Sequence, residues 1–281
     1  MVPGTAHSIL DLIGHTPLLH LARFAPPPLA GVYAKIEWLN PGGSVKDRAA
    51  LGMILNAEET GRLRPGATII EPTAGNTGIG LALVGIAKGY RVILCVPRGF
   101  AVEKMKLIEV LGGEIEYVPQ ESGMKGAIQR CHELAEEIPD SFVPQQFENT
   151  ANPCFHELTT AREIIEQMDG QIDAVVIGAG TSGTFVGVSR AIKKLNPDVL
   201  CVLVEPEGSI YGGGEPGPKK IEGIGQRDFI PPIYDASLAD EIMMVMDEDV
   251  CASLKQLARK GGLLGGWSSG AAATAAYKVA E

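Results

Sequence analysis

Short apolar runs rich in β-branched residues alternate with helical patterns along most of the chain, and this alternation restricts the possible folds more than any other feature. The runs span 67–72, 91–97, 114–119, 174–180 and 199–207, and the helical patterns between them span 79–89, 101–113, 125–138 and 184–195. The runs are continuously apolar, as in strands of a parallel sheet that is covered by helices on both faces. The sequence therefore predicts an α/β fold with doubly wound, mainly parallel sheets.

The remaining segments are predicted from the same patterns. A further strand is expected over 141–147, a helix around 153–168, and an Ala-rich helix from Gly270 that is still running at Glu281. A short C-terminal portion is therefore expected to follow Glu281. The length of 281 residues is typical of two domains at roughly 150 residues each.

Charge and cysteine content exclude several classes of function. The formal net charge is −10 and no stretch is rich in Lys or Arg, so neither nucleic acid nor an anionic membrane is expected as a partner. No apolar run reaches the ~18 residues of a membrane span. The five cysteines form no Cys-x-x-Cys pair, which favours free thiols in a reducing, cytoplasmic compartment. Cys154 and His156 come closest to metal-ligand spacing, and no metal site is predicted.

Glycine is in excess, and its clusters fall at the ends of apolar runs. It makes up 35 of the 281 residues, about 12% against roughly 7% in ordinary proteins. Since a side chain would block a close approach of the backbone, such clusters indicate loops that contact a ligand. Four glycine-containing loops also carry polar residues suited to chemistry, and they span 40–54, 71–80, 175–185 and 263–273.

The loop 40–54 places a lysine at a helix start. Ser44 can cap a helix that begins near Val45, with Lys46 in its first turn. The positive end of the helix dipole disfavours an ammonium there, which suits an amine nucleophile or base. An ordinary solvated lysine is the alternative.

The loop 71–80 lies between a predicted strand and a predicted helix. It combines short polar side chains with exposed backbone amides, and the residues are Thr73, Gly75, Asn76, Thr77 and Gly78. A carboxylate or a phosphate fits such a helix N-terminus. A tight strand-to-helix turn without a ligand is the alternative.

The loop 175–185 contains a dinucleotide-binding pattern. Gly178, Gly180 and Gly183 match G-x-G-x-x-G, and Glu205 follows where a ribose-binding acid would stand. An NAD-dependent oxidoreductase is therefore one interpretation. The same loop also carries three hydroxyls, on Thr181, Ser182 and Thr184. Together with backbone amides they favour a terminal phosphate monoester.

The last two irregular segments allow two interpretations each. Ser268 and Ser269 precede the Ala-rich helix, where they contact a ligand or only cap the helix. The Pro- and Gly-rich stretch 206–218 is an active-site loop or a surface excursion.

Taken together, the four loops resemble the cysteine synthase (O-acetylserine sulfhydrylase) and cystathionine β-synthase family, pyridoxal-phosphate enzymes of the tryptophan-synthase-β fold type. The resemblance covers essentially the whole chain. It includes IGHTPLLHL, NPGGSVKDR, EPTAGNTGIGLAL, QQFENTANP, GAGTSGT, KIEGIG and GLLGGWSSGAA. Because so many motifs match in register, the resemblance to this family is preferred over the interpretation as an NAD-dependent oxidoreductase.

The resemblance implies a role for each matching residue. Lys46 is implied as the Schiff-base lysine, Asn76 as a ligand of the cofactor's phenolic oxygen, and Ser268 as the partner of the pyridine nitrogen. The implied phosphate ligands are Gly180, Thr181, Ser182, Gly183 and Thr184. The implied ligands of the substrate carboxylate are Thr73, Ala74, Asn76, Thr77 and Gln146, and Gly225 is implied to line the substrate pocket.

The resemblance further implies β-replacement on O-acetyl-L-serine with sulfide, giving L-cysteine and acetate. The alternative within the family is condensation of O-acetylserine or serine with homocysteine, giving cystathionine. A non-catalytic binding partner is an alternative outside the family. The implied smaller, mobile domain spans 41–149 and the larger one 1–40 and 150–281, with the cofactor between them in a homodimer. Departures from the family pattern are Ala74 in place of serine, Ser182, Trp267 and one extra residue in EGIGQRDFIP.

Overall fold

The computed structural model describes residues 5–99 and 102–281, and the chain divides into two compact units. The first unit comprises Met1–His15 and Glu37–Phe155, and the second comprises Thr16–Ile36 and His156–Glu281. The predicted small domain, 41–149, lies within the first unit. Each unit contains its own parallel sheet and its own buried cores.

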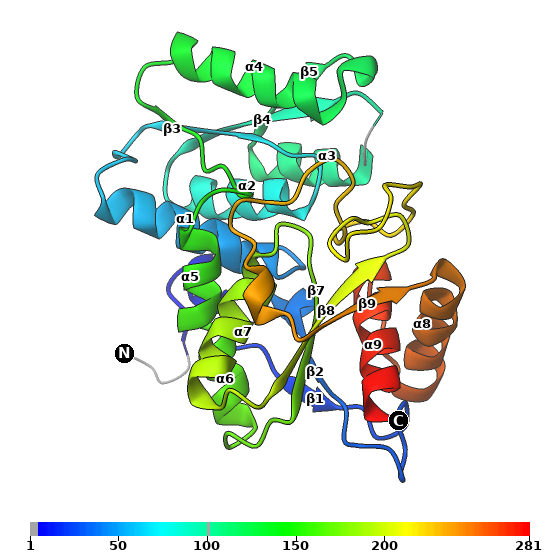
Figure 1. Cartoon of the computed structure of the whole chain (residues 1–281). Helices are drawn as coiled ribbons and strands as arrows, with labels where there is room; N and C mark the ends of the chain where they lie inside the picture. The colour runs from blue at the N-terminus through cyan, green and yellow to red at the C-terminus, as the bar shows by residue number, and fades with distance from the viewer. Residues whose placement is uncertain (1–4, 100–101) are drawn as a thin grey trace. The chain divides into compact units, whose positions relative to one another are not determined.

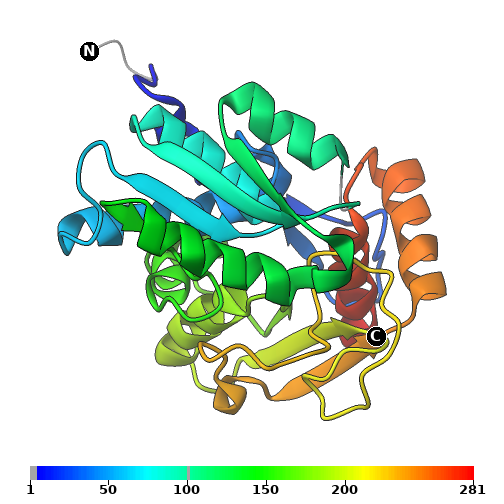
Figure 2. The ribbon, with the colours of Figure 1, turned by 90° about the horizontal axis from the view of Figure 1, so that it is seen from above.

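The first unit is a four-stranded parallel sheet covered on both faces. Its strands are β3 (Thr68–Pro72), β4 (Arg91–Pro97), β5 (Glu114–Val118) and β6 (Ser141–Phe142), in the order β5-β4-β3-β6. The helices α1 (Lys46–Glu59), α2 (Asn76–Ala87) and α3 (Val102–Leu111) lie on one face, and α4 (Gly123–Glu137) lies on the other (Figures 1 and 2). Three 3-10 turns belong to this unit: η1 (Ile9–Leu12), η2 (Glu37–Leu39) and η3 (Gln120–Ser122).

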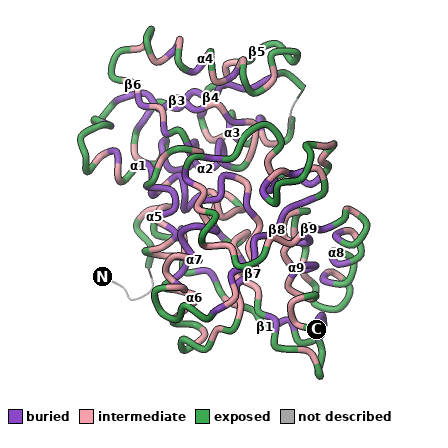
Figure 3. The backbone as a smooth tube through the Cα atoms, in the orientation of Figure 1, coloured by how far each residue is buried: buried purple, intermediate pink, exposed green. Residues whose placement is uncertain are grey.

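Successive residues of a central strand enter different cores of this unit. Ile69 packs in the cluster under α1, α2 and α3, whereas Ile70 packs in the cluster under α4. Both side chains are fully buried, and the central strands are drawn as buried in Figure 3. This two-sided burial explains why the strands read as continuous apolar runs.

The second unit repeats the arrangement with three parallel strands in the order β7-β8-β9. They are β7 (Ala174–Gly178), β8 (Leu200–Pro206) and β9 (Glu241–Val245). On one face lie α6 (Thr160–Gln167) and α7 (Gly183–Leu195), and on the other lie α8 (Asp247–Gly261) and α9 (Trp267–Ala280). The antiparallel pair β1 (Leu18–His20) and β2 (Tyr33–Lys35) and the turn η4 (Ala236–Leu238) complete it.

The structure confirms the α/β fold with mainly parallel sheets and corrects two predicted elements. The strand expected over 141–147 ends at Phe142, because Gln145 has a φ of +55° and its N–H binds a side chain instead of the sheet. The helix expected around 153–168 is two helices, α5 (Ala151–Leu158) and α6, separated at Thr159. Ala101, the first residue of another predicted helix, lies outside the described residues.

The described residues also bear on three features that the sequence raises: the cysteines, membrane spans and metal sites. Cys95, Cys131 and Cys201 are buried free thiols, and Cys251 and Cys154 are free and more exposed. Over 5–99 and 102–281, no helix is both long and apolar enough to cross a membrane. Within the same ranges, no three His, Cys, Asp or Glu side chains are grouped as a metal site would require.

Candidate active site

Lys46 lies in the first turn of α1, as the sequence predicts. Its N–H donates to Ser44 Oγ at 3.2 Å, so Ser44 binds the start of this helix. A Cβ atom on Gly80 would lie 2.8 Å from the Lys46 carbonyl oxygen, which shows how closely α2 approaches α1 at this point. Burial lowers the pKa of the Lys46 ammonium, because the charged form loses hydration. A lysine in this state is suited to act as an amine nucleophile and as a base.

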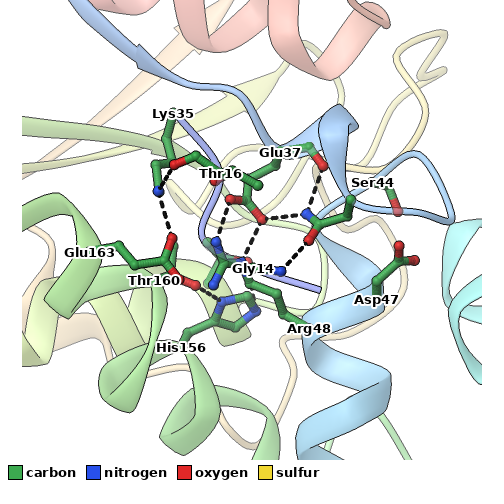
Figure 4. Close-up of polar contacts among 12 residues, drawn as sticks. Gly14, Thr16, Lys35, Glu37, Ser44, Asp47, Arg48, His156, Thr160 and Glu163 are labelled. Carbon is green, nitrogen blue, oxygen red and sulfur yellow. Dashed lines mark hydrogen bonds and ion pairs between the residues drawn. The ribbon is translucent and has the colours of Figure 1, made fainter. Parts of the chain in front are cut away.

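The residues next to Lys46 are held by buried charges. Arg48 forms a two-pronged ion pair with Glu37, with Nε–Oε2 and Nη2–Oε1 distances of 2.8 and 2.9 Å (Figure 4). Asn40 donates to the same carboxylate and accepts the N–H of Gly14 at 2.7 Å. Paired geometry of this kind is specific as well as strong. These contacts fix both ends of the loop that precedes Lys46.

Asp47 is a buried carboxyl that the sequence analysis did not single out. It accepts the N–H of Gly42 at 2.5 Å through Oδ2, while among the described residues Oδ1 has no hydrogen-bond partner. Burial raises the pKa of Asp47 to about 6. A Cβ on Gly42 would overlap this carboxyl, so a larger residue there would displace the Asp47 side chain.

The loop between β3 and α2 presents the predicted substrate-carboxylate ligands on one short segment. Thr73 and Thr77 are buried, and Asn76 is exposed at the first position of α2. Thr77 Oγ1 donates to Gln146 Oε1 at 2.7 Å, so the fold joins two of the predicted residues that are 69 positions apart. Ala74, the departure from the family pattern, is half-buried against the core.

Glu71 is a buried carboxyl at the end of β3 that binds the segment containing Gln146. The sequence analysis did not identify it. Its carboxylate accepts the N–H groups of Gln145 and Gln146 at 2.8 and 3.1 Å. Burial raises the pKa of Glu71 to about 7, against the effect of these hydrogen bonds. The carboxyl therefore sets the position of Gln146, and an acidic residue at the end of a buried strand was the available signal.

The predicted phosphate loop joins β7 to α7 in the second unit. Ser182 has a φ of +69° and is followed by the first helical residue, Gly183. The first amides of a helix have no partner within it, and with the helix dipole they form an anion-binding end. Ser182 Oγ donates to the Thr181 carbonyl at 2.6 Å, so this added hydroxyl is used within the loop.

His156 fixes one hydroxyl of the phosphate loop. Its Nε2 lies 3.2 Å from Thr184 Oγ1. Its Nδ1 lies 2.9 Å from Thr160 Oγ1, a contact drawn in Figure 4. Neutral imidazole has one donor and one acceptor nitrogen. If Nε2 is the donor, the Thr184 hydroxyl proton can point to an anion. The i, i+4 spacing of His156 and Thr160 was the only sequence signal.

The segment 223–225 packs directly on the phosphate loop. The N–H of Gly225 donates to the Ala179 carbonyl at 2.7 Å. A Cβ on Gly180 would overlap the carbonyl oxygen of Gly223, and a Cβ on Gly223 would lie 4.0 Å from Ser268 Oγ. Gly180, Gly225 and Ser268, three of the predicted residues, are therefore grouped around Gly223.

Glu205, the acid that suggested a dinucleotide site, has another function. It is 5% exposed, and its two oxygens accept the N–H groups of Tyr211 and Gly212, both at 3.0 Å. These bonds account for the buried carboxylate without a ribose hydroxyl.

Each unit by itself contains groups of a kind that suits pyridoxal phosphate. The first unit has an amine of lowered pKa, which suits an aldehyde, and the second has a glycine-containing loop at a helix N-terminus, which suits a phosphate. Ser268 offers a neutral hydroxyl, half-buried at the start of α9, for the pyridine nitrogen.

Comparison with known proteins agrees with this fit. The pyridoxal-phosphate-dependent enzyme family matches residues 9–281. A probable cysteine synthase of Bacillus subtilis (strain 168) is 48% identical over 275 residues, which cover 96% of this chain and 88% of that protein. An O-acetylserine-dependent cystathionine β-synthase of the same organism is also 48% identical, over 97% of this chain and 89% of its own length.

A solved structure shows the same fold. The crystal structure of O-acetylserine-dependent cystathionine β-synthase from Helicobacter pylori superposes with a TM-score of 0.92 at 44% identity. The match covers 98% of this chain and 90% of that one.

Proposed function

This chain belongs to the family of pyridoxal-phosphate-dependent enzymes, and from that premise we propose that it exchanges the acetate of O-acetyl-L-serine for sulfide, giving L-cysteine. The observation that carries the proposal is Lys46, a lysine of lowered pKa in the first turn of α1. The 48% identity to a probable cysteine synthase supports it.

We assign the binding residues as the family resemblance implies. The cofactor ligands are Lys46, Asn76, Gly180, Thr181, Ser182, Gly183, Thr184 and Ser268. The substrate ligands are Thr73, Ala74, Asn76, Thr77, Gln146 and Gly225. The mobility expected of 41–149 stays a prediction.

The reaction requires proton transfer at one carbon. Bound pyridoxal phosphate supplies an electron sink for the bond broken at the substrate Cα. With the cofactor bound, Lys46 Nζ would be the base that takes the substrate Cα proton. Acetate leaves Cβ with the bonding electrons, hydrosulfide adds to Cβ, and Lys46 returns the proton to Cα. Thr77 and Gln146 orient the substrate carboxylate throughout. The Ser268 hydroxyl cannot act as an anionic partner of the pyridine nitrogen, so the electron sink is moderate.

Homocysteine is the second candidate acceptor, and one observation favours it. The B. subtilis O-acetylserine-dependent cystathionine β-synthase is as similar to this chain, at 48% identity, as the probable cysteine synthase is. With homocysteine the product would be cystathionine.

A comparison of acceptors tests the proposal. The purified protein should be yellow, and its visible absorption band should shift on addition of O-acetylserine. Acetate release with sulfide should exceed release with homocysteine in kcat/KM; the reverse order would assign the cystathionine reaction. A colourless protein that binds NAD would overturn both.

Lys46→Ala should abolish turnover, since the variant lacks the base. The matched control is Lys125→Ala, at an exposed position of α4 on the other face of the sheet. Normal turnover in Lys46→Ala would show that another group is the base.

We also propose a homodimer in the cytoplasm. The homodimer follows from the family resemblance, and the location from the free thiols. Sedimentation of the purified protein measures the first.

A further inference from the structure

The carbonyl of Gly180 in the phosphate loop accepts two side-chain hydrogen bonds. Tyr211 donates from its hydroxyl at 2.8 Å, and Gln226 donates from Nε2 at 2.7 Å. The Gln226 amide orientation follows from this contact, because only its NH₂ group can donate to a carbonyl. With two donors, both lone pairs of the Gly180 oxygen are satisfied.

Fixing this oxygen also fixes the next amide. The Gly180 carbonyl and the Thr181 N–H belong to one planar trans peptide, so they point in opposite directions. Two donors on the carbonyl side therefore hold the Thr181 N–H toward the opposite side of the loop. The preceding carbonyl, of Ala179, is held in the same way by the Gly225 N–H.

The two donors come from two stretches whose purpose the sequence left open. Tyr211 lies in 206–218, where the Glu205 carboxylate fixes its backbone N–H. Gln226 occupies the segment that is one residue longer than in the family pattern. The two stretches are joined, since the Gln226 N–H donates to Ser209 Oγ at 3.2 Å and the Ile210 N–H donates to the Gln226 carbonyl at 2.9 Å.

The surroundings of Tyr211 keep its hydroxyl protonated, so it remains a hydrogen-bond donor. Its side chain is 6% exposed, and burial raises the pKa of its hydroxyl, which keeps the proton on the oxygen. Its ring meets the ring of Tyr234 edge to face, at 4.9 Å between centroids. Among the described residues, the buried hydroxyl of Tyr234 has no hydrogen-bond partner. The two neighbouring tyrosines thus differ in whether the hydroxyl contacts the loop.

We propose that Tyr211 and Gln226 are positioning residues, which orient the backbone amides of 180–184 toward the cofactor phosphate by holding the Gly180 carbonyl from behind. The inference rests on the proposed function, in which this loop binds the phosphate. It assigns to 206–226 the role of setting cofactor affinity in this chain.

The test compares two ligands that differ only in the phosphate. The full chain is stripped of cofactor and titrated with pyridoxal phosphate and with pyridoxal. Tyr211→Phe and Gln226→Leu should each weaken binding of pyridoxal phosphate about fivefold, as expected for one hydrogen bond, and leave pyridoxal binding unchanged. The double variant should lose more than the product of the two, because it leaves a carbonyl without either donor.

Tyr234→Phe is the matched control, and it should leave the affinity ratio of the two ligands unchanged. If Tyr211→Phe and Gln226→Leu weakened the binding of pyridoxal phosphate and of pyridoxal equally, the cause would be general destabilisation, and the inference would be overturned. It would also be overturned if both variants kept the wild-type ratio of the two affinities.

Thr184→Val separates this inference from the proposed function. If it lowers the ratio while Tyr211→Phe and Gln226→Leu do not, the loop binds phosphate but these two residues do not position it. If Thr184→Val leaves the ratio unchanged, the phosphate site itself is wrong, and the inference is overturned with it.

Discussion

Strands β3 and β8, in different units, end with the same dipeptide, and in both the glutamate accepts hydrogen bonds from backbone N–H groups. β3 ends with Glu71-Pro72 and β8 with Glu205-Pro206. Both glutamates are buried, at 1% and 5% exposure, and each carboxylate accepts the N–H groups of two consecutive residues. Those residues lie 74 and 75 positions after Glu71 but only six and seven after Glu205, so the first bonds hold a distant loop and the second hold the loop that directly follows the strand.

The anchored loops differ in what they hold. Glu71 holds Gln146, whose side chain contacts Thr77 on the proposed substrate side. Glu205 holds Tyr211, whose hydroxyl contacts Gly180 in the proposed phosphate loop. The same local chemistry therefore supports two separate tasks, and a buried acid at a strand end does not by itself identify a ligand.

Removing the carboxylates should give the largest effects and separate these tasks. Glu71→Ala and Glu205→Ala each leave one buried and one partly buried amide without its acceptor, which costs about 2 to 4 kcal/mol of unfolding free energy. In the protein that remains folded, Glu71→Ala should raise KM for O-acetylserine, and Glu205→Ala should weaken pyridoxal phosphate binding. Urea unfolding and the two titrations measure these effects. If both variants changed KM and pyridoxal phosphate affinity in the same way, the two carboxylates would not support separate tasks.

A methyl group added to one glycine of each loop should have a smaller effect on the free energy of unfolding, and only in the loop of the second unit. A Cβ on Gly180 overlaps the Gly223 carbonyl oxygen, a backbone atom that cannot move aside. Gly180→Ala should therefore cost about 2 to 3 kcal/mol. Gly75→Ala is the matched control: its φ is −126° and no described atom lies within 4 Å of the added Cβ, so the change should stay within about 1 kcal/mol. Urea midpoints compare the two, and equal losses would show that the loops are equally crowded.

The smallest expected effect is a pH dependence in the first unit. The pKa of Glu71 is raised to about 7, so the folded state binds this proton more strongly than the unfolded state does. Its contribution to stability is full below the unfolded pKa and is lost as the pH rises through about 7.

Between pH 5 and 8, wild-type protein should lose about 2 kcal/mol more unfolding free energy than Glu71→Gln does. A smaller fall should remain in the variant, because the pKa of Asp47 is also raised, to about 6. Chemical unfolding at several pH values measures the slopes, and parallel slopes would contradict the assignment to Glu71.

Much of the fold could be predicted because it depends on local patterns. The run 91–97 coincides with β4, since a continuous apolar run bounded by turn residues has few other solutions. The run 141–147 was wrong as a strand beyond Phe142, because the carboxylate that draws Gln145 out of the sheet lies 74 positions earlier. Such a contact leaves no local signal.

By itself the sequence determined the alternation of strands and helices over 67–138 and 174–207, the glycine loops at strand ends and the place of Lys46 in a first helical turn, whereas β9 and α8 were not predicted. Neighbouring residues suffice for the predicted features, through apolar periodicity, backbone freedom and the Ser44 hydroxyl beside the helix start. Only the tertiary structure decided that Glu71 and Glu205 bind backbone amides and that Tyr211 and Gln226 meet at one carbonyl. The latter two bonds span 31 and 46 positions, and a buried polar group selects its partner only after packing has removed water from around it.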